Sequence, residues 1–193
     1  MSWRASIFLT VLLLAGCGEM PVFDRSFIAS SYVANNFSTS LLMRATTGRA
    51  VPVRIVGQPF PGLSPGELAN RVLDAMPSGF LNRSEYMLDP GGITGVGFRV
   101  VWNFDPDPRA SEVDICQGRA GGRRPDANLR LRAAVALCQG PDAFVANYGT
   151  VQVTGPDDPH FASFISQMTL ATLLAPDPGK GSRTGGLDMH LGL

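Results

Sequence analysis

Five arginines in the second half of the chain form its only local excess of charge. They are Arg119, Arg123, Arg124, Arg130 and Arg132, and the one acidic residue among them is Asp126. Guanidinium groups bind phosphate and carboxylate oxygens through paired hydrogen bonds, so this segment could bind a lipid phosphate or an acidic partner. We prefer the simpler interpretation, a solvated hairpin loop, and keep anion binding as the alternative.

Residues that enzymes use for acid–base or nucleophilic chemistry are scarce. The only histidines are His160, at the start of an expected helix, and His190, near the C-terminus. The sequence contains no Gly-x-Ser-x-Gly elbow, no P-loop and no His-Glu-x-x-His, and the glycines of 92–97 have the wrong order for a dinucleotide fingerprint. The aspartates of 105–107 and 157–158 lack the spacing of a calcium loop. We therefore expect no catalytic residues and no metal site.

The beginning of the chain has the pattern of an export signal. Arg4 provides the positive start, and Ala5–Leu14 is a largely apolar run that is too short to cross a bilayer, which needs about 20 helical residues. The run ends in Leu14-Ala15-Gly16-Cys17. These four residues resemble the lipobox of bacterial lipoproteins, in which a branched apolar residue and two small residues precede an obligatory cysteine. The resemblance covers the signal only, and no family is recognised in residues 18–193.

The lipobox implies a covalent lipid anchor at Cys17. In bacterial lipoproteins the thiol carries diacylglycerol, a dedicated peptidase cuts before the cysteine, and the new amine is commonly acylated too. Each buried methylene contributes about 0.8 kcal/mol and stable anchoring takes two chains, so no transmembrane helix is needed. Gly18 stands where the inner-membrane retention signal has an aspartate. We expect the periplasmic face of the outer membrane, with that of the inner membrane as the alternative, and no cofactor besides the acyl chains.

The lipobox also places the other two cysteines in an oxidising compartment. Once Cys17 is lipidated, Cys116 and Cys138 are left as a pair, and we expect a disulfide between them. The bridge would close a loop of about 22 residues, which the chain-entropy model values at roughly 3 kcal/mol. A redox pair is the alternative, but Cys-x-x-Cys and a neighbouring histidine are both missing.

Length and charge limit the number of domains and the class of partner. The 193 residues can bury one core, and 22 glycines with 15 prolines indicate many turns. Sixteen basic and sixteen acidic residues cancel, and cleavage before Cys17 removes only one of them, Arg4. We expect one folded domain and no nucleic-acid partner.

Alternation of apolar and polar residues predicts the strands. Strands are expected at 51–55 and at 98–104, and a β-hairpin is expected from 129–137 and 144–153. In the second strand, the alternation of Phe98, Val100, Trp102 and Phe104 predicts one buried aromatic face.

Helical spacing and capping residues predict three helices. Apolar residues about four apart predict a helix within 25–46. A capping box from Ser64 to Glu67 begins a second helix that ends before Pro77, and Asp157 or Asp158 caps a third.

Together the elements predict an α+β fold, a mostly antiparallel sheet of four or five strands with helices packed on one face. The expected organisation is a signal peptide at 1–16, a lipidated tether at 17–24, a periplasmic domain at 25–175 and a disordered tail at 176–193.

Three functions fit a tethered domain of this kind. The first, which we prefer, is a non-catalytic envelope lipoprotein that binds another envelope protein or assists its assembly. The second is a carrier of a small ligand or lipid, with Phe98, Trp102 and Phe104 lining a pocket, although core packing explains the same alternation more simply. The third is a cell-wall hydrolase, which the scarcity of histidines and motifs weakens.

Overall fold

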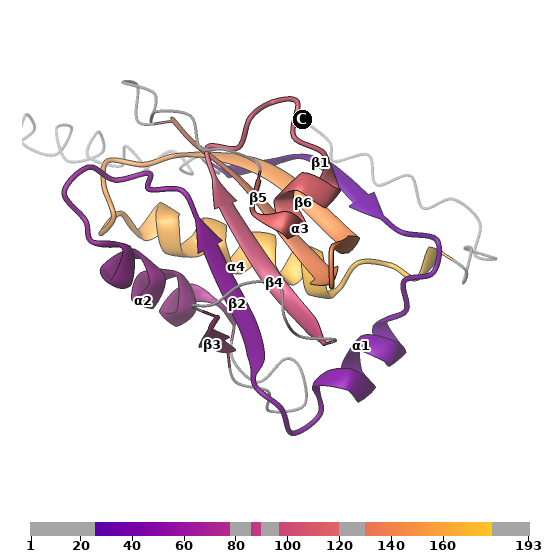
Figure 1. The fold of residues 1–193 in the computed structure, drawn as a ribbon. Coiled ribbons are helices and arrows are strands. Elements are labelled where there is room, and N and C mark those ends of the chain that lie inside the picture. Colours follow the sequence, from indigo (N-terminus) through magenta and orange to yellow (C-terminus); the bar gives the residue numbers. More distant parts are fainter. Residues whose placement is uncertain (1–25, 78–85, 90–96, 120–129, 179–193) are drawn as a thin grey trace, which may run out of the picture.

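Residues 26–77, 86–89, 97–119 and 130–178 are described by a computed structural model of the chain, and they form an α+β fold with six strands and four helices (Figure 1). The strands are β1 (Ser26–Val33), β2 (Val51–Val56), β3 (Tyr86–Leu88), β4 (Phe98–Phe104), β5 (Arg130–Gln139) and β6 (Asp142–Gln152). The helices are α1 (Thr39–Thr46), α2 (Pro65–Ala75), α3 (Glu112–Gln117) and α4 (Pro159–Leu173).

The strands form one mixed sheet in the order β1-β6-β5-β4-β2-β3. β1, β6, β5 and β4 pair in antiparallel fashion, whereas β2 is parallel to both β4 and β3. The expected α+β class is confirmed, but the sheet has six strands instead of four or five and is mixed, with antiparallel pairing confined to β1, β6, β5 and β4. β3 can run parallel to β2 because α2 lies between them in the chain and returns it to the same end of the sheet.

One face of the sheet carries the main hydrophobic core. α4 supplies Phe161, Phe164, Ile165 and Met168, which are at most 2% exposed. On the sheet, the rings of Trp102 and Phe104 are fully buried and stacked, with their centroids 5.9 Å apart. Phe98 packs edge-on against Phe144 instead. The aromatic residues of β4 therefore fill the core, as the simpler interpretation of their alternation predicts.

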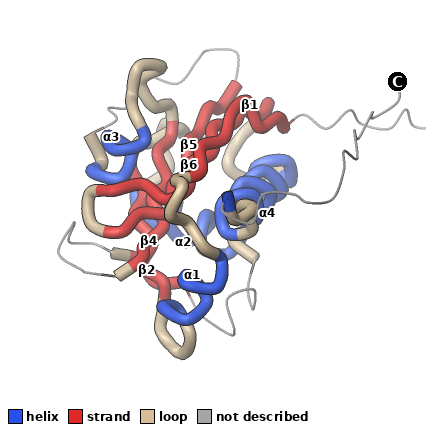
Figure 2. Tube along the Cα trace, turned by 90° about the vertical axis from the view of Figure 1, so that its right-hand side faces the viewer, coloured by secondary structure: helices blue, strands red, loops and turns tan. Residues whose placement is uncertain are grey.

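The opposite face of the sheet is covered by α3. Figure 2 shows α3 and α4 on opposite sides of the strands. Ile115 and Cys116 of α3 pack over small residues of β5 and β6, including Ala134, Ala136 and Ala146. The expectation that the helices cover one face only is thus wrong. α3 was not predicted because a helix of six residues is too short to show a period.

The N-terminal part of the domain differs from the predicted helix within 25–46. Residues Ser26–Val33 form the edge strand β1, paired with β6, and only Thr39–Thr46 are helical. A turn at Asn35 and Asn36 separates them. The serine, threonine and asparagine side chains disfavour a helix interior, and the backbone of β1 hydrogen-bonds to β6 instead, although Phe27, Ile28 and Tyr32 stay exposed.

The remaining predicted elements are confirmed. The strands at 51–55 and 98–104 are β2 and β4, and the hairpin is β5 with β6. α2 begins with the expected capping box, in which Ser64 N–H donates to Glu67 Oε2 at 2.9 Å and Glu67 N–H donates to Ser64 Oγ at 3.2 Å. α4 is capped by Asp158, whose carboxylate accepts a hydrogen bond from the N–H of His160.

The ends of the chain bear on the expected signal and tail. The lipobox, Cys17 and the tether lie outside the described residues, as do residues 179–193. Asp177, which falls in the predicted tail, accepts hydrogen bonds from the backbone N–H and the hydroxyl of Thr39 at the start of α1. In the part of the chain that the structure describes, no helix has the length and apolarity to cross a membrane.

Candidate binding groove

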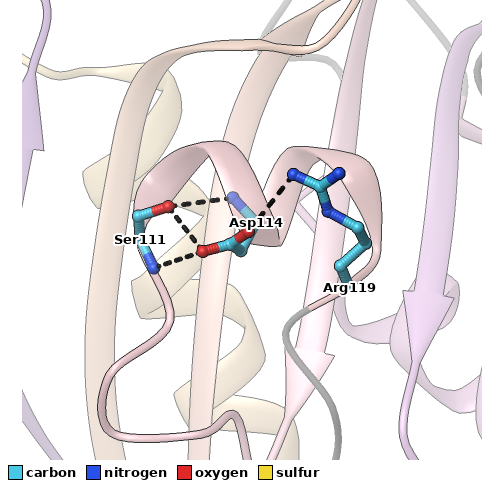
Figure 3. Close-up of polar contacts among 3 residues, drawn as sticks. All are labelled: Ser111, Asp114 and Arg119. Atoms are coloured by element: carbon cyan, nitrogen blue, oxygen red, sulfur yellow. Dashed lines mark hydrogen bonds and ion pairs between the residues drawn. The ribbon is translucent and has the colours of Figure 1, made fainter.

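α3 is a short helix whose two ends are both fixed by specific residues. At its start, Ser111 N–H donates to Asp114 Oδ2 at 3.1 Å and Asp114 N–H donates to Ser111 Oγ at 3.2 Å, a complete capping box (Figure 3). At its end, Gly118 adopts a left-handed conformation with φ of 67°. This left-handed conformation is one that glycine adopts without the strain that a Cβ would bring.

The capping box also sets the charge state of Asp114. Hydrogen bonds from the Ser111 hydroxyl and then from the Ser111 N–H lower the pKa of the Asp114 carboxyl. Arg119 follows one turn later and lies 3.4 Å from Asp114 Oδ1 (Figure 3). The carboxylate of Asp114 is therefore ionised at neutral pH and already engaged within its own helix.

The predicted disulfide between Cys116 and Cys138 is present. It connects α3 to the end of β5, with the two Cα atoms 5.7 Å apart and both side chains fully buried. Because β5 turns into β6 directly after Cys138, the bridge fixes α3 against the β5–β6 turn.

Arg99 strengthens the same connection from inside the protein. The residue is only 4% exposed, and its Nη2 donates to the carbonyl oxygens of Cys116 at 2.9 Å and of Gly140 at 2.6 Å. Burial and then the positive charge of Arg54 lower the pKa of Arg99, while Asp89 raises it. An arginine that begins so far above neutrality keeps its proton. α3 and the β5–β6 turn are thus joined by a disulfide and by a buried cation.

A groove of about 660 Å³ opens beside this joint. We call it the α3 groove. It lies between the start of α3, the β5–β6 turn and the end of β1. Its lining residues are Tyr32, Ala34, Asn36, Glu112, Val113, Gln139, Gly140, Asp142, Ala143 and Phe144.

The groove combines exposed apolar side chains with carboxylates. Tyr32 and Val113 are each 40% exposed, so they present apolar surface to solvent at the groove. Glu112 and Asp142 are the charged residues of the lining, so within the described lining all the charge is negative.

Tyr148 of β6 is half-buried near the start of α3, and its pKa depends on this burial and on the nearby carboxylates. Burial raises the pKa of its phenol to about 12, and the charges of Glu112 and Asp114 act in the same direction. The phenol is therefore neutral at physiological pH. The negative charge around the start of α3 comes from carboxylates alone.

Three of the five arginines that the sequence places together lie in the described part of the chain. Arg119 lies next to Asp114, and Arg132 Nε lies 3.8 Å from Oδ1 of the buried Asp105. Arg130 is exposed at the start of β5, while Arg123 and Arg124 lie outside the described residues. Two of the three described arginines thus have a carboxylate neighbour, and the neighbour of Arg132 comes from a distant part of the chain.

Sequence reasoning missed Arg99, Glu112 and Asp142. Arg99 stood out in one respect, because it is a single charge within the apolar strand β4. No local pattern marked Glu112 and Asp142, because they line one groove only through the tertiary contact between α3 and the β5–β6 turn. Only the pair Cys116 and Cys138 hinted at this contact.

The chain matches no protein-family model, no curated protein and no solved structure. Within residues 26–77, 86–89, 97–119 and 130–178, no three His, Cys, Asp or Glu side chains gather closely enough to bind a metal ion. His160 lies at the first turn of α4, with Nδ1 3.5 Å from Asp158 Oδ1.

Proposed function

We propose that this protein is a lipid-anchored envelope lipoprotein whose folded domain binds another envelope protein. Acyl chains on Cys17 anchor it to the periplasmic face of the outer membrane, or of the inner membrane as the alternative. The lipobox Leu14-Ala15-Gly16-Cys17 supports the anchor. The disulfide between Cys116 and Cys138 is compatible with an oxidising compartment.

The observation that carries the binding role is the α3 groove. Its walls are connected by the disulfide and by Arg99, so it is formed before any partner arrives. Tyr32 and Val113 leave apolar surface at the groove exposed to water. A protein partner that covered them would gain roughly 25 cal/mol for each Å² of apolar area removed from solvent.

We do not propose a lipid or small-ligand carrier. That function depended on Phe98, Trp102 and Phe104 lining a pocket, and these side chains are at most 7% exposed within the core. The α3 groove bears carboxylates as well as apolar side chains, which is more typical of a surface for a protein segment.

The anchor is tested by metabolic labelling with a radioactive fatty acid. We expect label on the wild-type protein and its recovery in the membrane fraction. The variant Cys17→Ser should carry no label and should leave the membrane fraction. Labelling that persists in this variant, or wild-type protein without label, would contradict the proposed anchor.

The binding role is tested by measuring the mass of the detergent-solubilised protein with light scattering. We expect a complex larger than one chain that dissociates in Val113→Arg, because a charge at the groove blocks a partner. Met87→Arg is the matched control, since Met87 is 51% exposed on β3 at the opposite edge of the sheet. A monomeric wild-type protein, or equal loss in both variants, would refute the role of the groove.

A further inference from the structure

We propose that the α3 groove binds a positively charged segment of the partner protein, one in which lysine or arginine alternates with aliphatic residues. The inference rests on the proposed function, in which the domain binds an envelope protein. It adds the chemical class of the segment that enters the groove.

Charge is the first argument for a basic segment. Glu112 belongs to α3 and Asp142 begins β6, so two different elements bring a carboxylate to the lining of the groove. The described lining contains no lysine or arginine. Complementary charge raises association rates and excludes partners of the wrong sign.

The nearest buried cation does not cancel this charge. Arg99 lies behind Gly140 and is only 4% exposed, and its Nη2 is engaged by the carbonyls of Cys116 and Gly140. On the solvent side of α3, Arg119 lies beside Asp114 rather than at the groove. Among the residues that the structure describes, the carboxylates of Glu112 and Asp142 are therefore the charges that line the groove.

Apolar contacts are the second argument, and they favour a segment over a free cation. Tyr32 and Val113 offer exposed apolar surface, and the ring of Phe144 is also part of the lining. The long methylene stems of lysine and arginine cover such surfaces while the charged end stays near water or a carboxylate. A cation close to the face of Tyr32 would gain a further attraction to the ring.

The rigid joint of α3 is the third argument. A surface that is fixed before binding loses less conformational freedom when a ligand arrives. The disulfide fixes α3 to β5, Arg99 connects α3 to the turn, and Ala34 N–H donates to the carbonyl of Phe144 at 2.7 Å, which secures the end of β1. All three walls of the groove are thus fixed within the protein itself.

An anionic ligand is disfavoured by the same residues. A phosphate in the α3 groove would meet the carboxylates of Glu112 and Asp142, and the described lining contains no cation to offset them. Of the arginines predicted from sequence as an anion site, the three that the structure describes, Arg119, Arg130 and Arg132, are not among the lining residues of this groove.

The test uses the mature, detergent-solubilised protein and two fluorescent octapeptides, one alternating lysine with leucine and the other alternating glutamine with leucine. Binding is followed by fluorescence anisotropy at low and high salt. We expect the lysine peptide to bind about tenfold more tightly than the glutamine peptide, and salt to remove most of this difference.

Variants of the protein locate the binding. Replacing both acidic residues, Glu112→Gln with Asp142→Asn, should weaken binding of the lysine peptide about tenfold, whereas Asp74→Asn, an exposed carboxylate on α2, should leave it unchanged. Equal affinity for the two peptides, no binding of the lysine peptide, or equal effects of the groove and control variants would overturn the proposal. None of these results would alter fatty-acid labelling at Cys17 or the effect of Val113→Arg on the envelope complex, so the proposed function is judged separately.

Discussion

The two faces of the sheet are packed with different kinds of side chain. The face under α4 is packed with large side chains, among them Trp102, Phe104, Phe161 and Phe164. The face under α3 is packed with alanines and with Cys116 and Cys138, and it contains the buried cation of Arg99. The first face buries far more apolar surface for each residue. The second depends on a covalent bond and on directed hydrogen bonds.

This difference indicates how the domain divides its tasks. The α4 face supplies most of the hydrophobic stabilisation, because burial of large apolar side chains is the dominant favourable contribution to folding. The alanines on the other face let α3 lie close to the strands, so its start stands beside the β5–β6 turn and forms the α3 groove. A small core here would be weak without the disulfide and Arg99. We interpret them as the means by which a surface for binding stays ordered.

The largest loss of stability is expected when a large side chain is removed from the α4 face. Phe164→Ala should lower the free energy of unfolding by about 3 to 5 kcal/mol, because Phe164 is only 1% exposed and its loss leaves a cavity. Urea unfolding followed by circular dichroism measures this change. Val113→Ala on α3 is the control and should change stability by less than about 1 kcal/mol. Similar losses in both variants would contradict the division between the faces.

Removing the disulfide should have the next largest effect. In the double variant Cys116→Ser, Cys138→Ser we expect the free energy of unfolding to fall by about 3 kcal/mol, as the chain-entropy model gives for a loop of this length. Amide hydrogen exchange should rise first in α3 and the β5–β6 turn. If α4 loses protection as much as α3 does, the bridge is not specific to the α3 face.

Arg99→Met tests how much the buried cation contributes to the stability of the α3 face. The substitution removes the donors to the carbonyls of Cys116 and Gly140, while it also removes a buried charge, so we expect a net loss of about 1 to 2 kcal/mol. Exchange of the amides in α3 should increase, and the lysine peptide should bind more weakly because the groove is less rigid. Unchanged exchange and unchanged binding would show that Arg99 does not support the groove.

The helix caps on the two faces give the smallest effects, and they depend on pH. Hydrogen bonds from the backbone of His160 and Thr154 lower the pKa of Asp158 at the start of α4, and those from Ser111 lower the pKa of Asp114 in α3. A carboxyl with a lowered folded-state pKa stabilises the protein above its unfolded value near 3.8, and this stabilisation is lost as the pH falls through the folded value.

Asp158→Ala should therefore cost about 1 kcal/mol at pH 7, as expected for loss of an N-cap, and much less at pH 2. Asp158→Asn keeps a capping oxygen and should lose less stability at pH 7, although its contribution to the acid dependence disappears. Urea unfolding at the two pH values provides the measurement. A loss that does not change with pH would exclude the ionised cap as its cause.

The sequence contained enough information for the α4 face and little for the α3 face. The long alternations of β4, β5 and β6 and the caps of α2 and α4 are local signals, so these elements could be predicted. β1 could not, because the spacing of Ile28, Tyr32 and Phe37 also fits a helix, and only pairing with β6 decides in favour of a strand. α3 is too short to show a period. Glu112 and Asp142 line the same groove only because α3 contacts the β5–β6 turn. In the sequence, only the expected pairing of Cys116 with Cys138 indicated this contact.

The most direct test of the account is photo-crosslinking in intact cells, with a photoreactive amino acid placed at Val113 or at Met87. Both positions are exposed, and they lie at the α3 groove and at the opposite edge of the sheet respectively. The account predicts one discrete adduct from Val113, none from Met87, and loss of the Val113 adduct when Glu112→Gln and Asp142→Asn are also present. An adduct from Met87 alone, or a Val113 adduct that survives removal of both carboxylates, would contradict it.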